Sequence, residues 1–175
     1  ISQMNQHKVN RVLCKYVIVS KKENILDWLD NKSQKKFRDK VVKFLNSSVP
    51  NYYKNPSPER IAEGHTGGWQ YDFKVGSEEA RQAASMWVNA LAKNQWVAPH
   101  WPKEYGGGGL SPMEQFILRS EFAWHGVPPV AGPGVNMLGP TIVLHGTEAQ
   151  KKELLPPILS GEVTWAQGYS EPGAG

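Results

Sequence analysis

Residues 111–126, SPMEQFILRSEFAWHG, carry the strongest folding signal in the chain. Ser111 and Glu114 have the spacing of a capping box, in which each side chain accepts a hydrogen bond from the other residue's backbone N–H. Pro112 stands at the first helical position, where the missing N–H of proline removes no helical bond. The stretch therefore predicts an amphipathic helix that stops at Gly126. Its apolar residues recur at helical spacing: Met113, Phe116, Ile117 and Trp124.

Two further helices are predicted before this one. Ser33 is a suitable N-cap for a helix that Pro50 ends, and Ser77, followed by two acidic residues, opens another. Residues 51–76 contain Pro, Gly, Asn and aromatic residues without a period, which predicts a long loop or short irregular helices. The expected apolar faces are Phe37, Val41, Phe44 and Leu45 in the first helix, and Ala80, Ala84, Trp87, Val88 and Leu91 in the second.

Two more helices are predicted after residue 126. One covers residues 135–145 and is closed by Gly146, and Thr147 with Gln150 then forms a second capping box. We expect the proline pair 156–157 to disturb the helix that this box opens, because proline removes a helical N–H and clashes with the preceding turn.

Large and small residues alternate in residues 163–169, VTWAQGY, which is the two-residue repeat of a β-strand. A single strand leaves its backbone groups unpaired, so it implies a sheet supplied by residues outside this sequence. The predicted class is an all-α domain with one terminal strand. We expect a poorly ordered basic leader (1–23), a helical domain (24–162) and the start of a truncated β-domain (163–175).

Composition excludes several classes of protein. With 175 residues, 39% of them hydrophobic, the chain has the size of one domain, and it contains no apolar run long enough to span a membrane. The single cysteine, Cys14, excludes an internal disulfide and a Cys-rich zinc site. The histidines lack metal-ligand spacing, and no phosphate-binding loop, dinucleotide fingerprint or Gly-x-Ser-x-Gly elbow is present. We therefore expect no metal site.

Positive charge is concentrated in residues 1–60, which hold 13 Lys and Arg against 5 Asp and Glu. A targeting segment or a nucleic-acid arm would explain such a bias. Lys15 interrupts the apolar run that a secretory signal needs, and no aromatic residues alternate with the basic ones to stack on bases. We expect no nucleic-acid partner, and interpret the first residues as a partial or read-through start.

Three segments in order identify a relationship: WPKEYGGGGLS (101–111), GTEAQKK (146–152) and WAQGYSEPGAG (165–175). Together they resemble the acyl-CoA dehydrogenase family over residues 30–175. The resemblance implies the amino-terminal helical domain of that fold, followed by the first strand of its middle β-domain. For the complete protein it implies FAD as cofactor, α,β-dehydrogenation of an acyl-CoA thioester, and reoxidation by an electron-transferring flavoprotein.

The last of these segments carries the flavin contacts in the family. When a flavin accepts hydride, negative charge develops along its N1–C2=O edge, where backbone N–H groups and a short hydroxyl are suitable donors. Glycine in the turn that follows lets the backbone approach the cofactor closely. The cofactor-binding residues that the resemblance implies are Gln167, Gly168, Tyr169, Ser170, Gly173 and Gly175.

The resemblance also implies where the acyl group binds, although an ordinary core helix explains the same residues equally well. These substrate-binding residues are Met137, Leu138, Gly139 and Pro140. The glutamate base of the family lies outside this sequence, so we expect no catalytic residue here and no turnover by these residues alone. The aromatic residues of 51–76 and the form of 165–170 resemble the branch that handles bulky, dicarboxylic or sterol-side-chain acyl groups.

The resemblance further implies an oligomeric complete protein in the cytoplasm, or in the mitochondrion if the source is eukaryotic. Two alternatives remain open at this point. An acyl-CoA oxidase would pass its electrons to oxygen instead of to a flavoprotein. A non-catalytic helical module would use the basic half of the chain to bind an anionic partner.

Overall fold

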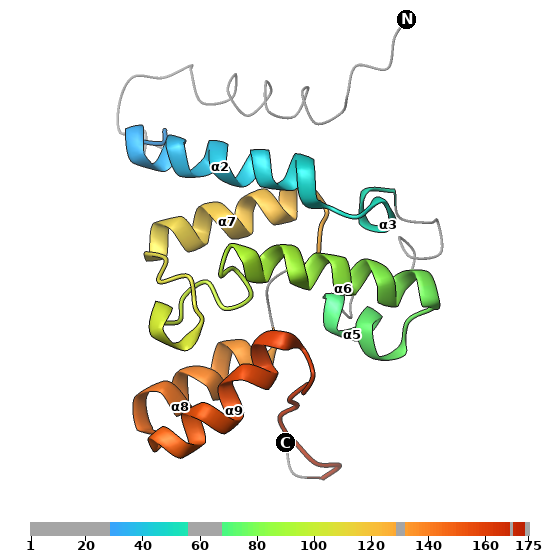
Figure 1. Cartoon of the computed structure of the whole chain (residues 1–175), viewed down its shortest axis with the longest axis vertical. Coiled ribbons are helices and arrows are strands. Elements are labelled where there is room, and N and C mark those ends of the chain that lie inside the picture. The colour runs from blue at the N-terminus through green and yellow to red at the C-terminus, as the bar shows by residue number, and fades with distance from the viewer. Residues whose placement is uncertain (1–28, 56–67, 129–131, 169, 174–175) are drawn as a thin grey trace, which may run out of the picture. The chain divides into compact units, whose positions relative to one another are not determined.

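The computed structural model describes residues 29–55, 68–128, 132–168 and 170–173 (Figure 1). The chain divides into two units, residues 1–31 and residues 32–175, and the helices below all belong to the second. The predicted leader at 1–23 lies outside the described residues. Within the described ranges, no helix is both long and apolar enough to cross a membrane.

Apart from an isolated bridge at Glu171, the regular structure described in the second unit is helical, in agreement with the predicted all-α class. Figure 1 shows α2 beside α7, and α8 beside α9 at the red end of the chain. The elements are α2 (Lys32–Ser48), α3 (Asn51–Lys54), α5 (Gly68–Val75), α6 (Glu78–Lys93), the 3₁₀ turn η1 (Lys103–Tyr105), α7 (Pro112–Trp124), the π-helix η2 (Gly134–Leu138), α8 (Gly139–His145) and α9 (Glu148–Ser160).

Both predicted capping boxes are confirmed. At the start of α7 the backbone N–H of Ser111 donates to Oε2 of Glu114 (2.9 Å), and the hydrogen bonds from Ser111 lower the pKa of the Glu114 carboxyl. At the start of α9 the backbone N–H of Thr147 donates to Oε1 of Gln150 (2.8 Å). Ser77 caps α6 by accepting from the backbone of Ala80. Local side-chain chemistry thus defines three helix starts.

The prediction that the prolines at 156–157 disturb helix α9 is wrong. Helix α9 continues through both prolines to Ser160 and ends at Gly161, whose φ of 75° is left-handed. Two buried residues on either side of the proline pair, Leu155 and Ile158, hold the helix against the core, while Pro156 is exposed. Packing of the apolar face therefore outweighs the two missing N–H groups.

Residues 163–168 form no strand, which differs from the local prediction. The only extended pairing among the described residues of this end is an isolated bridge at Glu171. A strand needs a neighbour to satisfy its backbone, and the described part of the chain offers no sheet. The alternating pattern of residues 163–169 thus remains compatible with a strand that pairs with residues outside this sequence.

Two apolar clusters form the core. The larger one joins α2, α6 and α7, and the smaller one joins η2, α8 and α9 to the segment around Trp101. Leu159 packs against both. The largest side chains with under 2% exposure are tryptophans: Trp69, Trp87, Trp96 and Trp101.

A buried ion pair joins α2 to α7. Arg38 Nη1 lies 2.8 Å from Oε1 of Glu121, whose side chain is 5% exposed. The imidazole of His125 contacts the backbone carbonyl of Glu121 (2.8 Å). A carboxylate at this depth is stable only while its charge is compensated.

Replacing Arg38 with Ala is expected to lower the free energy of unfolding by about 2–4 kcal/mol, because the buried Glu121 carboxylate then loses its 2.8 Å ion pair with Arg38. Arg38 is itself 25% exposed, which keeps the effect below that of a fully buried pair. Urea unfolding measures the difference. Arg81→Ala is the control, since its partner Glu78 is 71% exposed, and it should cost less than about 1 kcal/mol. Equal losses would contradict the assigned role of the buried pair.

Candidate functional site

The segment predicted to bind a cofactor is open to its surroundings. Gln167, Gly168, Ser170 and Gly173 are exposed, whereas Tyr169 and Gly175 lie outside the described residues. A Cβ built on either Gly168 or Gly173 meets no atom within 4 Å. Gly173 has a φ of 95°, which favours glycine. The backbone of this segment is therefore accessible to a ligand or to another part of a protein.

Trp165 brings the two predicted binding segments together. Its ring lies against Gly134, where an added Cβ would be 3.1 Å from Cδ1 of the indole. It also packs against the smaller core cluster, which includes Ile158. Trp165 stands two residues before Gln167, and Gly134 stands three before Met137. The predicted cofactor and acyl segments are therefore anchored at one place.

The segment predicted to bind the acyl group coincides with an irregular helix. In η2 the backbone N–H of Gly139 donates to the carbonyl of Gly134, five residues back. Met137 is 50% exposed, while Leu138 and Pro140 are half-buried. Met137 and Leu138 thus offer apolar surface at a π-helical turn, an irregularity that is frequent at functional sites.

Gly139 has a different environment from the other three residues of this segment. It is buried, and a Cβ at this position would overlap the ring of Trp101. The Trp101 indole N–H donates to the backbone carbonyl of Val135 (2.9 Å). The structure therefore shows Gly139 in contact with the protein interior, whereas its predicted role in substrate binding stays a prediction.

Sequence reasoning missed the importance of Trp101, which served only to mark a motif. The glycine run after it folds back tightly around this residue, with Gly108 and Gly109 donating backbone hydrogen bonds to Ala98 (3.1 Å) and Trp101 (2.9 Å). Gly107 and Gly108 are buried. Four consecutive glycines shortly after Trp-Pro were the available signal, because such a run permits close backbone approach.

His100 lies beside the same turn. Burial is the main cause that lowers the pKa of its imidazole from 6.5, and the charge of Arg119 lowers it further. A hydrogen bond to the backbone of Val135 acts in the opposite direction. Its Nδ1 is buried and has no hydrogen-bond partner among the described residues. The arrangement favours a neutral imidazole.

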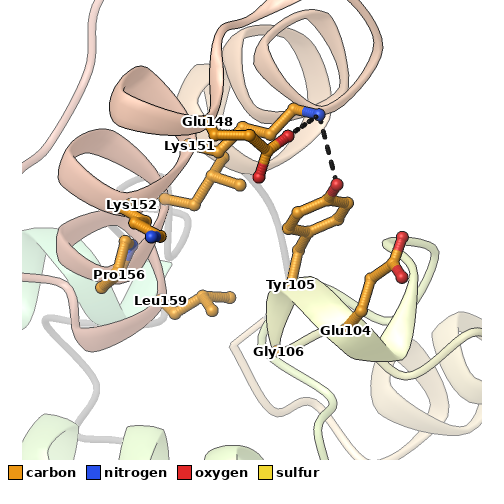
Figure 2. A pocket seen from close by; sticks show the side chains of 9 residues that line it. Glu104, Tyr105, Gly106, Glu148, Lys151, Lys152, Pro156 and Leu159 are labelled. Atoms are coloured by element: carbon orange, nitrogen blue, oxygen red, sulfur yellow. Dashed lines mark hydrogen bonds and ion pairs between the residues drawn. The ribbon is translucent and has the colours of Figure 1, made fainter.

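A separate cavity of about 480 Å³ lies between η1 and α9 (Figure 2). Lys151 crosses it, donating to the hydroxyl of Tyr105 (3.2 Å) and to Glu148 (3.0 Å). The bond to Glu148, followed by the bond to Tyr105, raises the pKa of the Lys151 ammonium. None of the predicted site residues lines this cavity. Its lining residues are Glu104, Tyr105, Gly106, Glu148, Lys151, Lys152, Leu155, Pro156 and Leu159.

The described residues contain no group of three or more His, Cys, Asp or Glu side chains arranged to hold a metal ion. The predicted cofactor segment offers exposed backbone and the Ser170 side chain, and the predicted acyl segment offers the apolar side chains of Met137 and Leu138.

Comparison with known proteins gives one family. The model of the acyl-CoA dehydrogenase N-terminal domain matches residues 71–162. The acyl-CoA dehydrogenase FadE26 of Mycobacterium tuberculosis is 42% identical over 106 residues, which are 61% of this chain and 25% of that protein. The chain therefore spans about a quarter of the length of this curated relative.

Solved structures show the same relationship. The structure of the Tcur3481-Tcur3483 steroid ACAD G363A variant matches with a TM-score of 0.57 and 38% identity, over 82% of this chain and 33% of that one. The ChsE4-ChsE5 complex from Mycobacterium tuberculosis matches with a TM-score of 0.57 and 30% identity, over 86% of this chain and 33% of that one.

The lowered pKa of His100 predicts a pH-dependent stability. Protonation is less favourable in the folded state than in the unfolded one, so this contribution is complete above pH 6.5 and is lost as the pH falls below that value. We expect urea unfolding to show a smaller loss of stability between about pH 7 and about pH 5 for His100→Gln than for the unchanged protein. Parallel pH profiles for the two proteins would contradict this role.

Proposed function

The chain belongs to the acyl-CoA dehydrogenase family, and from this we propose that it forms part of a longer FAD-dependent enzyme that dehydrogenates the α,β bond of an acyl-CoA thioester. The observation that carries the proposal is the packing of Trp165 against Gly134, which anchors the predicted cofactor segment beside the predicted acyl segment. The chain's coverage of only a quarter of FadE26 supports the existence of further domains.

The proposed FAD site comprises the exposed residues 166–168 and 170–173. When bound, FAD would supply the acceptor for the hydride that leaves the β-carbon of the substrate. The chain's own contribution would be donation of hydrogen bonds to the flavin edge, by the Ser170 hydroxyl and by backbone N–H groups around Gly168. Both residues are exposed, and open space surrounds the position of a Cβ on Gly168, so a planar ring system can approach them.

The acyl group would lie against the π-helical turn. Met137 offers a half-exposed, flexible thioether, and Leu138 adds apolar surface beside it. We propose that these two side chains, with Pro140, exclude water from the reacting carbons on one side. The carboxylate that removes the α proton would come from residues outside this sequence.

We further propose a bulky acyl-CoA as the substrate class. The support is one structural neighbour, the Tcur3481-Tcur3483 variant, which is named a steroid ACAD. Another neighbour is a complex of two different proteins, which supports an oligomeric complete enzyme. An electron-transferring flavoprotein is the proposed acceptor, and peroxide formed in proportion to the substrate consumed would instead identify an oxidase.

The test of cofactor binding replaces Ser170 with Ala in the protein made from the complete gene. Loss of one donor to developing negative charge is expected to slow flavin reduction by roughly 10²-fold, which corresponds to about 3 kcal/mol. Anaerobic stopped-flow absorbance measures this rate with an acyl-CoA, and the ratio of flavin to protein absorbance measures cofactor content. These 175 residues expressed alone are expected to show no turnover.

Thr164→Ala is the matched control, because Thr164 carries an exposed hydroxyl in the same segment and is not a predicted flavin contact. It should keep both the flavin content and the reduction rate. If Ser170→Ala behaves like this control, the role given to Ser170 is wrong. If the complete protein retains no flavin, the proposed function itself is wrong.

A further inference from the structure

We propose that Trp101 is a positioning residue that fixes the π-helical turn η2 and thereby sets where Met137 and Leu138 meet the acyl group. The proposal rests on the proposed function for its consequence in catalysis. Its structural part, the coupling of the Trp101 indole to the backbone of the turn, is argued from this chain alone.

The hydrogen bonds of the turn show why it needs a donor from outside. The N–H of Gly139, which would serve the Val135 carbonyl in an α-helix, donates instead to Gly134. The π-helical alternative for the Val135 carbonyl is residue 140, which is proline and has no N–H. The helix therefore leaves this carbonyl without a donor of its own, and the Trp101 indole supplies one at 2.9 Å.

Steric contact reinforces the hydrogen bond. The ring of Trp101 occupies the space in which a side chain at position 139 would begin, so the ring and the helix backbone are in direct contact. Trp101 is only 1% exposed, and its indole N–H bond is buried. The donor and the surface that it supports thus form one packed unit.

The support of Trp101 is itself rigid. Its carbonyl accepts from Gly109 (2.9 Å), and its N–H donates to Ala98 (3.1 Å). An added Cβ on Gly107 would overlap the backbone of Trp101, so the glycine loop closes directly over it. Movement of the Trp101 backbone would require these bonds to break and the loop to open.

The geometry of the turn has a direct consequence for the acyl site. A π-turn holds one more residue than a regular α-turn. Its conversion to an α-turn would therefore rotate α8 relative to the residues before η2 by about 100°, the rotation of one α-helical residue. Met137 and Leu138 would then point in new directions relative to α8. Loss of the Trp101 donor should therefore alter which acyl groups fit, beyond any loss of stability.

The experiment uses Trp101→Phe in the complete enzyme, which keeps an aromatic ring and removes the N–H. We expect the ratio of kcat/KM for a steroid-type acyl-CoA to that for a short straight-chain acyl-CoA to change by up to about tenfold, because the buried Val135 carbonyl loses its indole donor and keeps only the hydrogen bond from His100. Amide hydrogen exchange at Gly139 should accelerate, because each rearrangement between the π-turn and an α-turn breaks its bond to Gly134 and leaves the N–H briefly unbonded.

Two further variants separate positioning from general destabilisation. Trp87→Phe is the matched control: Trp87 is equally buried, but its indole N–H has no partner among the described residues, so no hydrogen bond is lost. It should leave the ratio of substrates and the Gly139 exchange unchanged. Pro140→Ala, combined with Trp101→Phe, supplies a backbone N–H to Val135 and should restore slow exchange at Gly139 at least in part; the substrate ratio is not used for this variant, because Pro140 belongs to the proposed acyl site.

The outcomes distinguish the two proposals. If Trp101→Phe and Trp87→Phe give the same substrate ratio and the same exchange, the positioning role is overturned. If Pro140→Ala fails to slow the Gly139 exchange of the Trp101→Phe protein, the role given to the indole donor at the Val135 carbonyl is wrong. If the unchanged enzyme dehydrogenates no acyl-CoA, the proposed function fails, and the exchange at Gly139 still decides whether Trp101 holds the turn.

Discussion

Contact between indole rings and glycine backbone is the constraint on which this helical unit depends. Trp101 lies on Gly139 at the start of α8, Trp69 lies on Gly161 at the end of α9, and Trp165 lies on Gly134. An added Cβ on Gly161 would be 2.7 Å from the Trp69 ring, too close for any side chain. Because Trp69 belongs to the larger apolar cluster and α9 to the smaller one, this contact joins the two. Large rings and missing side chains are therefore complementary parts of one core.

Local signals in the sequence predicted helix starts well and irregularities poorly. The boxes at Ser111 and Thr147 depend on residues three positions apart, so a pattern contains all the information required. The course of α9 through Pro156 depends instead on burial of its apolar face, which no local rule describes. The π-turn was predicted as an ordinary helix over 135–145, since the donor that stabilises it lies 34 residues away from its acceptor.

In the candidate site, too, some features were predicted from the sequence and others are known only from the structure. Resemblance to a family predicted the residues around Ser170 and around Met137, and their roles remain predictions. That the two segments share an anchor depends on Trp165 packing against Gly134, a contact between residues 31 apart in the chain that spacing alone does not reveal. The glycines 106–109 permit a close backbone approach, but only the structure identifies Trp101 as the residue approached.

An irregular helix depends on distant residues for some of the hydrogen bonds that a regular helix makes within itself. A regular helix satisfies its own interior carbonyls, whereas the Val135 carbonyl is satisfied only from outside the helix. Leaving such a buried group unpaired costs about 1–3 kcal/mol, a sizeable share of the roughly 5–15 kcal/mol that stabilises a domain. The position of the apolar surface at Met137 is consequently tied to the loop that holds Trp101. Substitutions in residues 98–110 can therefore alter the shape of the surface at Met137 through Trp101.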